Sequence, residues 1–417
     1  MSPPLLPSLL IPRLPFFYGW VVLGCVCLAC FARQGPSVAV LSIFVTPMTE
    51  YFGWSRTAIA GAVSVGGVLA AVISPIIGPM LDRQGARLVL TLAVLLSGVA
   101  CMGLSLVQSL PVFYLVFCFA RMIWAGPFDL GLYGALNAWF VTHRAFVTSI
   151  ATVAQIGGLI ALPLIAQFAI GAGDWRDGWI AVGATVLIVG FLPSWLLLVR
   201  RPEDVGLVPD RLASANAAAT PVEPRFSRAQ AMRTPAFWLL SLFTVLVYPV
   251  QAGVSLHQVP HLIERGISPM IAASAVGVFS SMSAVATIGF GYLARRGPIR
   301  YSMALAALLL GSGSFGLIWV HGASGAYLAA GVFGMGIGGI LTLLPIAWAD
   351  YFGRESYGAI RGVALSLQVL AQAVGPVLSG VLRDSGGDYV RSLMVFGTLS
   401  ALAVAAALVA QKPRGVA

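Results

Sequence analysis

Stretches of about 20 apolar residues recur along the whole chain with only short polar breaks between them. We predict twelve membrane-spanning helices from these stretches, at residues 17–46, 55–81, 88–108, 111–140, 145–170, 177–199, 235–262, 269–294, 301–320, 325–349, 357–382 and 389–410. Hydrophobic residues make up 59% of the chain and charged residues 9%, so a soluble fold of 417 residues would lack a polar surface. A membrane barrel would instead show short segments of alternating hydrophobicity. We therefore expect an all-α, multi-pass membrane protein.

The arginines and the single lysine are distributed unequally between the two sides of these spans. Seventeen fall on the side that carries both termini, five fall on the other side, and two lie inside spans. This bias predicts that both termini are cytoplasmic. We expect the chain to lie in a bacterial inner (plasma) membrane. The net charge of +10 does not indicate nucleic acid as a partner, because the basic residues form no patch with interleaved aromatic residues.

One connection, residues 200–234, is long and polar, and it divides the spans into two sets of six. We read it as a cytoplasmic linker between an N-terminal bundle, residues 1–199, and a C-terminal bundle, residues 235–417. The two halves repeat, since Arg144 and Ser149 recur 217 positions later as Arg361 and Ser366. A repeat of this kind predicts two pseudo-symmetric six-helix bundles with a site near the membrane midplane.

A loop with an acid, basic residues and glycine, Gly78 to Arg87, lies between the second and third predicted spans. Its spacing resembles the signature loop of the major facilitator superfamily. Asp82 can face the start of the eleventh span, where the positive end of a helix dipole attracts a carboxylate. We expect a conformational latch formed by Gly78, Asp82, Arg83 and Arg87.

Further motifs are similar to those of the monocarboxylate-transporter-like and oxalate–formate-antiporter-like branch of this superfamily. They are Tyr18-Gly-Trp20, Phe52-Gly-Trp-Ser-Arg56, Trp139-Phe140 with Arg144, Trp175-Arg176, the start of the linker at Arg201 to Asp210, and Gly375-Pro376 with Gly380, Asp384 and Tyr389. The resemblance covers nearly the whole chain and implies the major facilitator fold. It does not imply a particular substrate, because members with different cargo share loops and packing glycines.

Three charged residues lie within predicted spans and away from their ends, namely Arg33 in the first span and Arg121 and Asp129 in the fourth. A charge at this depth is costly unless it faces protein or water, so it marks a candidate functional site. We expect Arg33 and Arg121 to bind a carboxylate, which a guanidinium group matches with two hydrogen bonds. We expect Asp129 to balance these cations in the empty site and to accept a proton during transport.

Each of these assignments has a structural alternative. Arg121 with Gly126 loosely matches the fourth-span Arg–Gly motif of the superfamily, which implies an orienting role for the helix. In many members a fourth-span acid pairs with the signature-loop arginine, here Arg83 or Arg87, and Asp129 could do the same. Gly35-Pro36 beside Arg33 is compatible with a gating helix or with a simple kink.

The chain departs from the resemblance in the eighth span. Transporters of the branch carry an arginine there, and alignment on Gly291 places Thr287 at that position. Either Arg33 or Arg121 supplies the positive charge from the other half, or the substrate is not a simple monocarboxylate.

Several polar residues lie at depths suited to lining a transport path. These candidates are Tyr133, Asn137, Tyr248, Gln251, His257, Gln368 and Gln372. His257 and His261 lie one helical turn apart but have no visible third ligand, so we expect no metal site and no cofactor.

These features together predict a secondary active transporter that moves a small organic anion, a carboxylate, with protons by alternating access. We expect a monomer and no enzymatic activity. The alternative is an exporter that exchanges protons for apolar or cationic molecules, which the sparse charge of the second half permits. A membrane sensor or an enzyme is a second rival, from a different class of protein, and no soluble domain or catalytic pair supports it.

Overall fold

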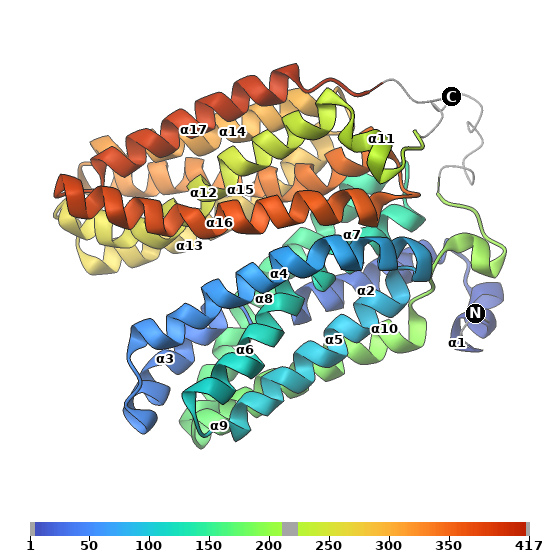
Figure 1. Cartoon of the computed structure of the whole chain (residues 1–417), viewed down its shortest axis with the longest axis horizontal. Coiled ribbons are helices and arrows are strands. Elements are labelled where there is room, and N and C mark those ends of the chain that lie inside the picture. Colours follow the sequence, from blue (N-terminus) through green and yellow to red (C-terminus); the bar gives the residue numbers. More distant parts are fainter. Residues whose placement is uncertain (1–4, 211–223, 414–417) are drawn as a thin grey trace. The chain divides into compact units, whose positions relative to one another are not determined.

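The computed structural model describes residues 5–210 and 224–413, and every regular element within these ranges is helical (Figure 1). Eleven described helices are long and apolar enough to cross a membrane, and two shorter apolar helices share the first predicted span. The all-α membrane fold expected from the sequence is therefore confirmed. Residues 211–223 of the predicted linker lie outside the described residues.

The chain divides into two compact units. Unit 1 is Met1–Glu223 with Arg354–Ser366, and unit 2 is Pro224–Gly353 with Leu367–Ala417. The helices of unit 1 are α1 (Leu5–Leu10), η1 (Ile11–Arg13), α2 (Gly19–Ala32), α3 (Val38–Phe52), α4 (Arg56–Gln84), α5 (Ala86–Gly103), η2 (Leu104–Leu106), α6 (Leu110–Ala125), α7 (Pro127–Trp139), α8 (Arg144–Ala172), α9 (Trp175–Thr185), η3 (Val186–Phe191), α10 (Leu192–Leu197) and η4 (Pro202–Val205). Those of unit 2 are α11 (Arg228–Met232), α12 (Pro235–Glu264), α13 (Pro269–Leu293), α14 (Ile299–Gly316), η6 (Leu317–Trp319), α15 (Gly322–Phe352) and α17 (Val390–Val409).

Helix α16 (Tyr357–Gly386) contributes to both units. Its first turns, up to Ser366, group with unit 1, and the residues from Leu367 group with unit 2. The sequence predicted a simple boundary at the linker, and the repeat contained no signal that the eleventh span would be divided in this way.

Polar caps mark where many of the helices begin. The hydroxyl of Ser55 accepts a hydrogen bond from the backbone N–H of Ala58, and Thr234 and Ser268 cap α12 and α13 in the same manner. Asp174 and Asp177 form a reciprocal capping box at the start of α9. Such caps satisfy backbone donors that the first turn of a helix leaves without a partner.

Two predicted spans are interrupted at a Gly–Pro pair. The first span breaks between α2 and α3 at Gly35-Pro36, and Ser37 caps the start of α3. The fourth span breaks between α6 and α7 at Gly126-Pro127. Proline cannot donate the backbone hydrogen bond that would continue a helix, so each break exposes helix ends within the span.

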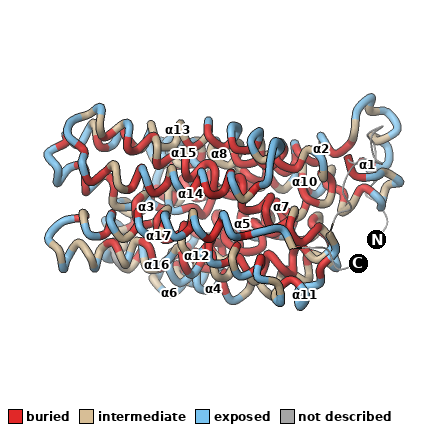
Figure 2. Tube along the Cα trace, turned by 90° about the horizontal axis from the view of Figure 1, so that it is seen from above, coloured by how far each residue is buried: buried red, intermediate tan, exposed pale blue. Residues whose placement is uncertain are grey.

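Close contacts at glycine hold the helices of unit 2 together. Gly334 and Gly338 of α15 lie directly against the backbone of α13 at Phe279 and Ser283. The glycine-rich segment of the tenth span is therefore a packing surface between α15 and α13. Figure 2 shows buried residues along the middle of the helices and exposed residues concentrated in the connections at their ends.

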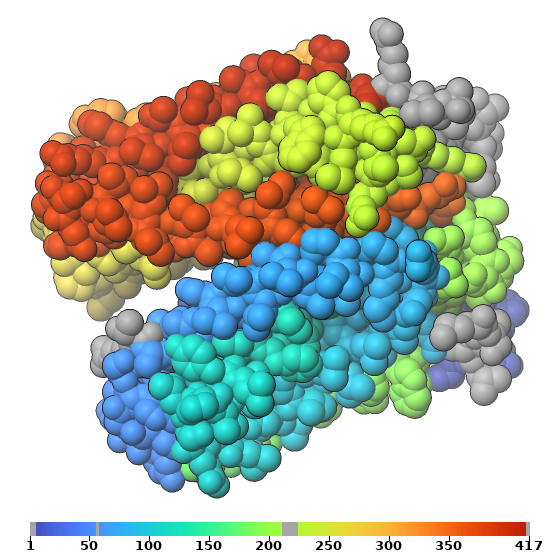
Figure 3. Space-filling model, in the orientation of Figure 1, coloured from blue at the N-terminus to red at the C-terminus, as the bar shows by residue number. Residues whose placement is uncertain are grey.

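Large apolar side chains are exposed along the outside of the spans. Helices α4 and α6 pack side by side (Figure 3). Helix α4 exposes Val72 and Ile76, and α6 exposes Leu115. Exposed apolar side chains of this kind suit contact with lipid acyl chains.

Candidate functional site

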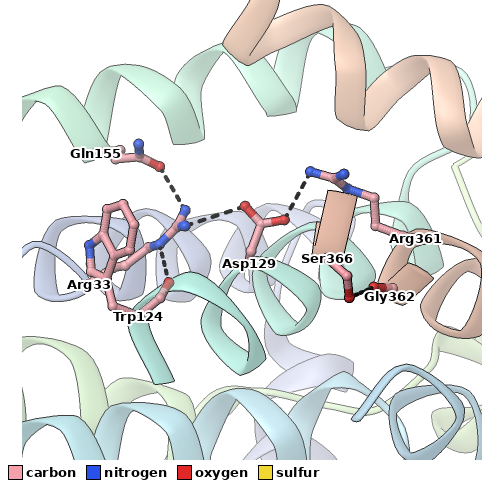
Figure 4. Close-up of polar contacts among 7 residues, drawn as sticks. All are labelled: Arg33, Trp124, Asp129, Gln155, Arg361, Gly362 and Ser366. Atoms are coloured by element: carbon pink, nitrogen blue, oxygen red, sulfur yellow. Dashed lines mark hydrogen bonds and ion pairs between the residues drawn. The ribbon is translucent and has the colours of Figure 1, made fainter. Parts of the chain in front are cut away.

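The first element of the candidate site is the end of α2. Arg33 is the residue that follows the last turn, and its side chain is 7% exposed. Its Nε donates to the carbonyl of Trp124 at 3.0 Å, Nη1 donates to Gln155 at 3.3 Å, and Nη2 lies 3.4 Å from Asp129 (Figure 4). A cation at the C-terminal end of a helix also gains from the negative end of the helix dipole.

The second element is the start of α7. Asp129 lies in its first turn, where the positive end of the helix dipole favours a carboxylate. Its Oδ2 pairs with Arg33 and its Oδ1 lies 3.3 Å from Nη2 of Arg361. The Asp129 carboxylate therefore bridges two arginines from helices that are distant in the sequence (Figure 4).

The breaks in the first and fourth spans explain this arrangement. The break after α2 supplies a helix end beside Arg33, and the break at Gly126-Pro127 supplies a helix start beside Asp129. The cation therefore lies at the negative end of one helix dipole and the carboxylate at the positive end of another. Both lie deep in segments that were predicted as single spans.

The third element is Arg121 on α6, which is 9% exposed. Its guanidinium carbon lies 3.8 Å from the ring centre of Trp124, and that of Arg33 lies 4.7 Å from the same ring. Stacking on one aromatic ring lets the two cations lie near each other. Nε and Nη1 of Arg121 are buried and have no hydrogen-bond acceptor among the described residues.

Helix α4 makes room for Arg121 at Gly66. A Cβ atom at position 66 would lie 2.6 Å from Cβ and 2.7 Å from Cγ of Arg121. The absence of a side chain at Gly66 therefore allows α4 and α6 to approach each other at the depth of Arg121.

Arg361 was not among the predicted site residues. It is 1% exposed and is delivered to Asp129 by the first turns of α16, the part of that helix that belongs to unit 1. The repeat of Arg144 and Ser149 as Arg361 and Ser366 singled out this position without indicating what it contacts. The structure also pairs Asp129 with Arg33 and Arg361, whereas the sequence-based alternative had paired it with Arg83 or Arg87.

Two of the four predicted latch residues, Gly78 and Asp82, contact the start of α16, whereas the contacts of Arg83 and Arg87 are with Arg200 and Trp195. Oδ1 and Oδ2 of Asp82 accept hydrogen bonds from the backbone N–H groups of Gly358 and Ala359, each at 2.7 Å. Gly78 lies directly against Gly358, with no space for a side chain on either residue. The carbonyl of Arg83 accepts a hydrogen bond from Arg200, and Arg87 donates to the carbonyl of Trp195.

The start of the predicted linker is fastened to the same end of unit 1. Asp210 accepts hydrogen bonds from the backbone N–H groups of Val141, Thr142 and His143, at 2.6, 3.1 and 2.8 Å, and contacts the imidazole Nδ1 of His143 at 2.9 Å. Glu203 pairs with Arg354 at 2.8 Å, and Arg354 also donates to the carbonyl of Ala138. The sequence motif of Arg201 to Asp210 thus positions the loop between α7 and α8.

The other predicted path-lining residues are divided between the two units. In unit 1, Tyr133 and Asn137 are buried in α7, and Nδ2 of Asn137 has no acceptor among the described residues. In unit 2, Gln372 donates to Gln251 at 3.1 Å, while Tyr248 and Gln368 are buried.

His257 and His261 make hydrogen bonds within unit 2. The ring of His257 contacts Tyr389 at 3.3 Å through Nδ1 and the carbonyl of Pro376 at 3.1 Å through Nε2. His261 contacts the carbonyl of Leu317 at 2.8 Å. In residues 5–210 and 224–413 no three His, Cys, Asp or Glu side chains group as metal ligands.

Thr287 occupies the eighth-span position at which the resemblance implied an arginine. It is fully buried, and its hydroxyl donates to the carbonyl of Ser283 at 2.9 Å, with the Gly338 carbonyl at 3.4 Å. This position therefore faces the seam between α13 and α15, where a long cationic side chain would have no space.

Comparisons with known proteins agree with this architecture. A family model described as Major Facilitator Superfamily matches residues 22–376. Monocarboxylate transporter 11 of Homo sapiens is 27% identical over 398 residues, covering 92% of this chain and 80% of that protein. Membrane sensor protein UhpC of Salmonella typhimurium is 27% identical over 361 residues, covering 81% of this chain and 80% of that protein.

A solved structure with the same fold is that of the human organic anion transporter MFSD10 (TETRAN). Its TM-score is 0.69 at 16% identity, with 93% of this chain and 97% of that chain covered. At this identity the likeness concerns the fold alone. Since the family model spans most of the sequence and the helices follow the expected pattern, the chain belongs to the Major Facilitator Superfamily and is a membrane transporter rather than an enzyme.

Proposed function

We propose that the protein is a proton-coupled symporter of a small organic anion, a carboxylate, that works by alternating access. The observation that carries this proposal is the buried guanidinium group of Arg121, whose Nε and Nη1 have no acceptor among the described residues. Leaving such donors without partners is costly, and a carboxylate bound beside them would satisfy both.

The charges around Trp124 support an anionic substrate. Arg33, Arg121 and Arg361 carry three positive charges, and Asp129 supplies one negative charge between two of them. This buried group has an excess of positive charge that a carboxylate would reduce. A relative that covers most of the chain is named a monocarboxylate transporter, which favours the same class of substrate.

The two arginines have different tasks in this proposal. Arg33 already has three acceptors, at Trp124, Gln155 and Asp129, whereas Arg121 has two donors without one. Arg121 is therefore the first contact for the substrate. Arg33 becomes available when Asp129 accepts a proton, which provides the coupling between proton and anion.

The remaining predicted residues complete the proposal. Tyr133, Asn137, Tyr248, Gln251, His257, Gln368 and Gln372 line the path that the substrate follows. Gly78, Asp82, Arg83 and Arg87 form a latch that breaks and re-forms as the halves move relative to each other. The bias in arginine distribution supports an orientation with both termini in the cytoplasm, and we propose a monomer in a bacterial inner membrane.

The decisive experiment is uptake by the purified full-length protein in proteoliposomes. Radiolabelled L-lactate, pyruvate and succinate are offered with an imposed inward proton gradient, and ethidium is offered with the gradient reversed. Accumulation of a carboxylate that collapses with a protonophore supports the symporter. Proton-driven movement of ethidium without carboxylate uptake would favour the exporter, and absence of any flux would favour a sensor, the function named for the relative UhpC.

A binding measurement supplements the flux assay. Ligands that bind only the folded state raise the melting temperature, because they stabilise that state by RT ln(1 + L/Kd), where L is the free ligand concentration. We expect the effective carboxylates to stabilise the wild-type protein and to stabilise Arg121→Ala much less.

A further inference from the structure

A small cavity lies within unit 1, at the end where α4 finishes and α16 begins. Its volume is about 30 Å³, which is room for about two water molecules or for the outer oxygen atoms of one small anion. Four charged residues contribute to its lining, namely Asp82, Arg200, Arg201 and Arg354. Three cations therefore surround the cavity together with one carboxylate, and all four residues belong to unit 1.

The carboxylate of Asp82 is bound to the backbone of α16. Its two oxygens accept hydrogen bonds from the N–H groups of Gly358 and Ala359, each at 2.7 Å, so its charge is directed at the positive end of the α16 dipole. Arg201 contacts Asp82 through the backbone carbonyl, at 3.3 Å. Within residues 5–210 and 224–413, Arg200 and Arg201 hydrogen-bond to backbone carbonyls and form no ion pair.

The carbonyl groups at the end of α4 orient Arg200 and Arg201. Nη2 of Arg200 donates to the carbonyl of Arg83 at 2.8 Å, next to the bond from Arg201. A side chain at Gly85, where φ is +86°, would collide with the aliphatic part of Arg200. A guanidinium group has five N–H donors, and Nε of Arg200 is buried with no acceptor among the described residues. The backbone contacts therefore fix the two side chains and leave donors for a ligand.

Arg354 supplies the third cation from the connection that precedes α16. It donates to the carbonyl of Ala138 at 3.0 Å and to the carboxylate of Glu203 at 2.8 Å. The side chains of Arg354 and Glu203 are 27% and 46% exposed, so solvent and salt weaken this pair. The cavity thus keeps an excess of positive charge, and it is close to water.

We propose that this cavity binds a phosphate-type oxyanion, supplied either as free phosphate or as the phosphate headgroup of an anionic lipid. Guanidinium groups match the oxygens of phosphate with paired hydrogen bonds, and basic pockets at the ends of membrane helices suit anionic headgroups. Two oxygens of the anion enter the cavity toward Arg200 and Arg201, and the remainder faces the solvent. This site is separate from Arg33, Arg121 and Asp129, so the inference does not rest on the proposed function.

A bound anion joins three segments of unit 1 that lie far apart in the sequence. Arg200 and Arg201 open the predicted linker, Asp82 lies in the last turn of α4, and Arg354 precedes α16. Binding should therefore slow hydrogen exchange of the backbone amides in residues 200–205 and 354–359. The alternative is that the arginines only cap the carbonyl end of α4, in which case an anion changes neither exchange nor stability.

The test measures the melting temperature of the purified full-length protein in phosphatidylcholine nanodiscs, with inorganic phosphate replacing chloride at constant ionic strength. We expect a saturable rise of about 2 °C or more in the wild-type protein. In Arg201→Gln the apparent Kd for phosphate should increase about tenfold, because one charge-assisted contact is lost. Arg201→Lys keeps the charge and should lie between the two.

Two control variants locate the effect. Arg13→Gln removes an exposed cation of η1 in unit 1 that does not line the cavity, and it should keep the full response to phosphate. Arg121→Ala removes a cation of the candidate substrate site and should also keep it. An equal response in Arg201→Gln and the wild-type protein would overturn the inference, as would loss of the response in Arg121→Ala alone.

The source of the phosphate group is separated by lipid composition. If the ligand is a lipid, nanodiscs that contain phosphatidylglycerol should raise the melting temperature without added phosphate, and Arg201→Gln should abolish this rise. If the ligand is free phosphate, the response should be the same with either lipid. Hydrogen exchange of the wild-type protein with and without phosphate or phosphatidylglycerol decides the matter should Arg201→Gln fail to fold. No protection of residues 200–205 and 354–359 under any of these conditions would refute the site.

Discussion

Asp129 and Arg361 lie 3.3 Å apart in the folded chain although 232 positions separate them in the sequence. The same carboxylate contacts Arg33, so a residue near the middle of the fourth span joins the end of α2 to the start of α16. This bridge places the candidate anion site in direct contact with the first turns of α16 through one carboxylate.

Removal of Arg121 tests the proposed substrate contact. Arg121→Ala should abolish carboxylate uptake, and Arg121→Lys should raise the KM about tenfold, because an ammonium group cannot reproduce the planar donors of guanidinium. The measurement is concentration-dependent uptake in proteoliposomes, with the exposed Arg295→Ala as the control. Wild-type kinetics in Arg121→Ala would remove this residue from the site.

Neutralisation of Asp129 tests proton coupling. Asp129→Asn preserves the size of the side chain but cannot alternate between charged and neutral forms, so accumulation of substrate against a gradient should be lost. Exchange of labelled for unlabelled substrate, which needs no net proton movement, should be retained at a reduced rate. A variant that still concentrates substrate when the external pH is lowered contradicts the assignment.

Gly66 offers a test of the space around Arg121. Gly66→Ala would place a methyl group against Cβ and Cγ of Arg121, so the guanidinium should shift and the KM should rise several-fold. Gly157→Ala is the matched control, because a Cβ atom at that position of α8 meets nothing within 4 Å. Equal effects of the two substitutions would show that the change acts through helix flexibility and not through Arg121.

Asp82 is expected to stabilise the start of α16. Asp82→Ala removes two hydrogen bonds from the first turn of the helix and should cost about 1 kcal/mol or more of stability. The melting temperature should fall relative to Asp204→Ala, a nearby acid on the linker. An unchanged melting temperature with unchanged uptake would argue against a latch at this position.

The sequence pattern predicted some residues of the candidate site but not the residues that contact them. The depth of Arg33, Arg121 and Asp129 within apolar segments was sufficient to select them, because a buried charge is costly wherever the helix faces. The residues that contact them could not be predicted from depth within a span. Gln155, Trp124 and Arg361 become neighbours only through the rotation of each helix about its axis, which depends on packing contacts such as that of Gly66 with Arg121.

By itself, the sequence determined the twelve spans, the two-fold repeat and the membership of a transporter superfamily, because hydrophobic length and loop charge act locally along the chain. Tertiary structure alone decided that Asp129 serves both Arg33 and Arg361, that Thr287 faces a closed helix seam, and that the first turns of α16 group with unit 1. The physical reason is that an ion pair between distant helices depends on the rotation and depth of each helix. Rotation and depth result from the packing of the whole unit and cannot be read from any single residue.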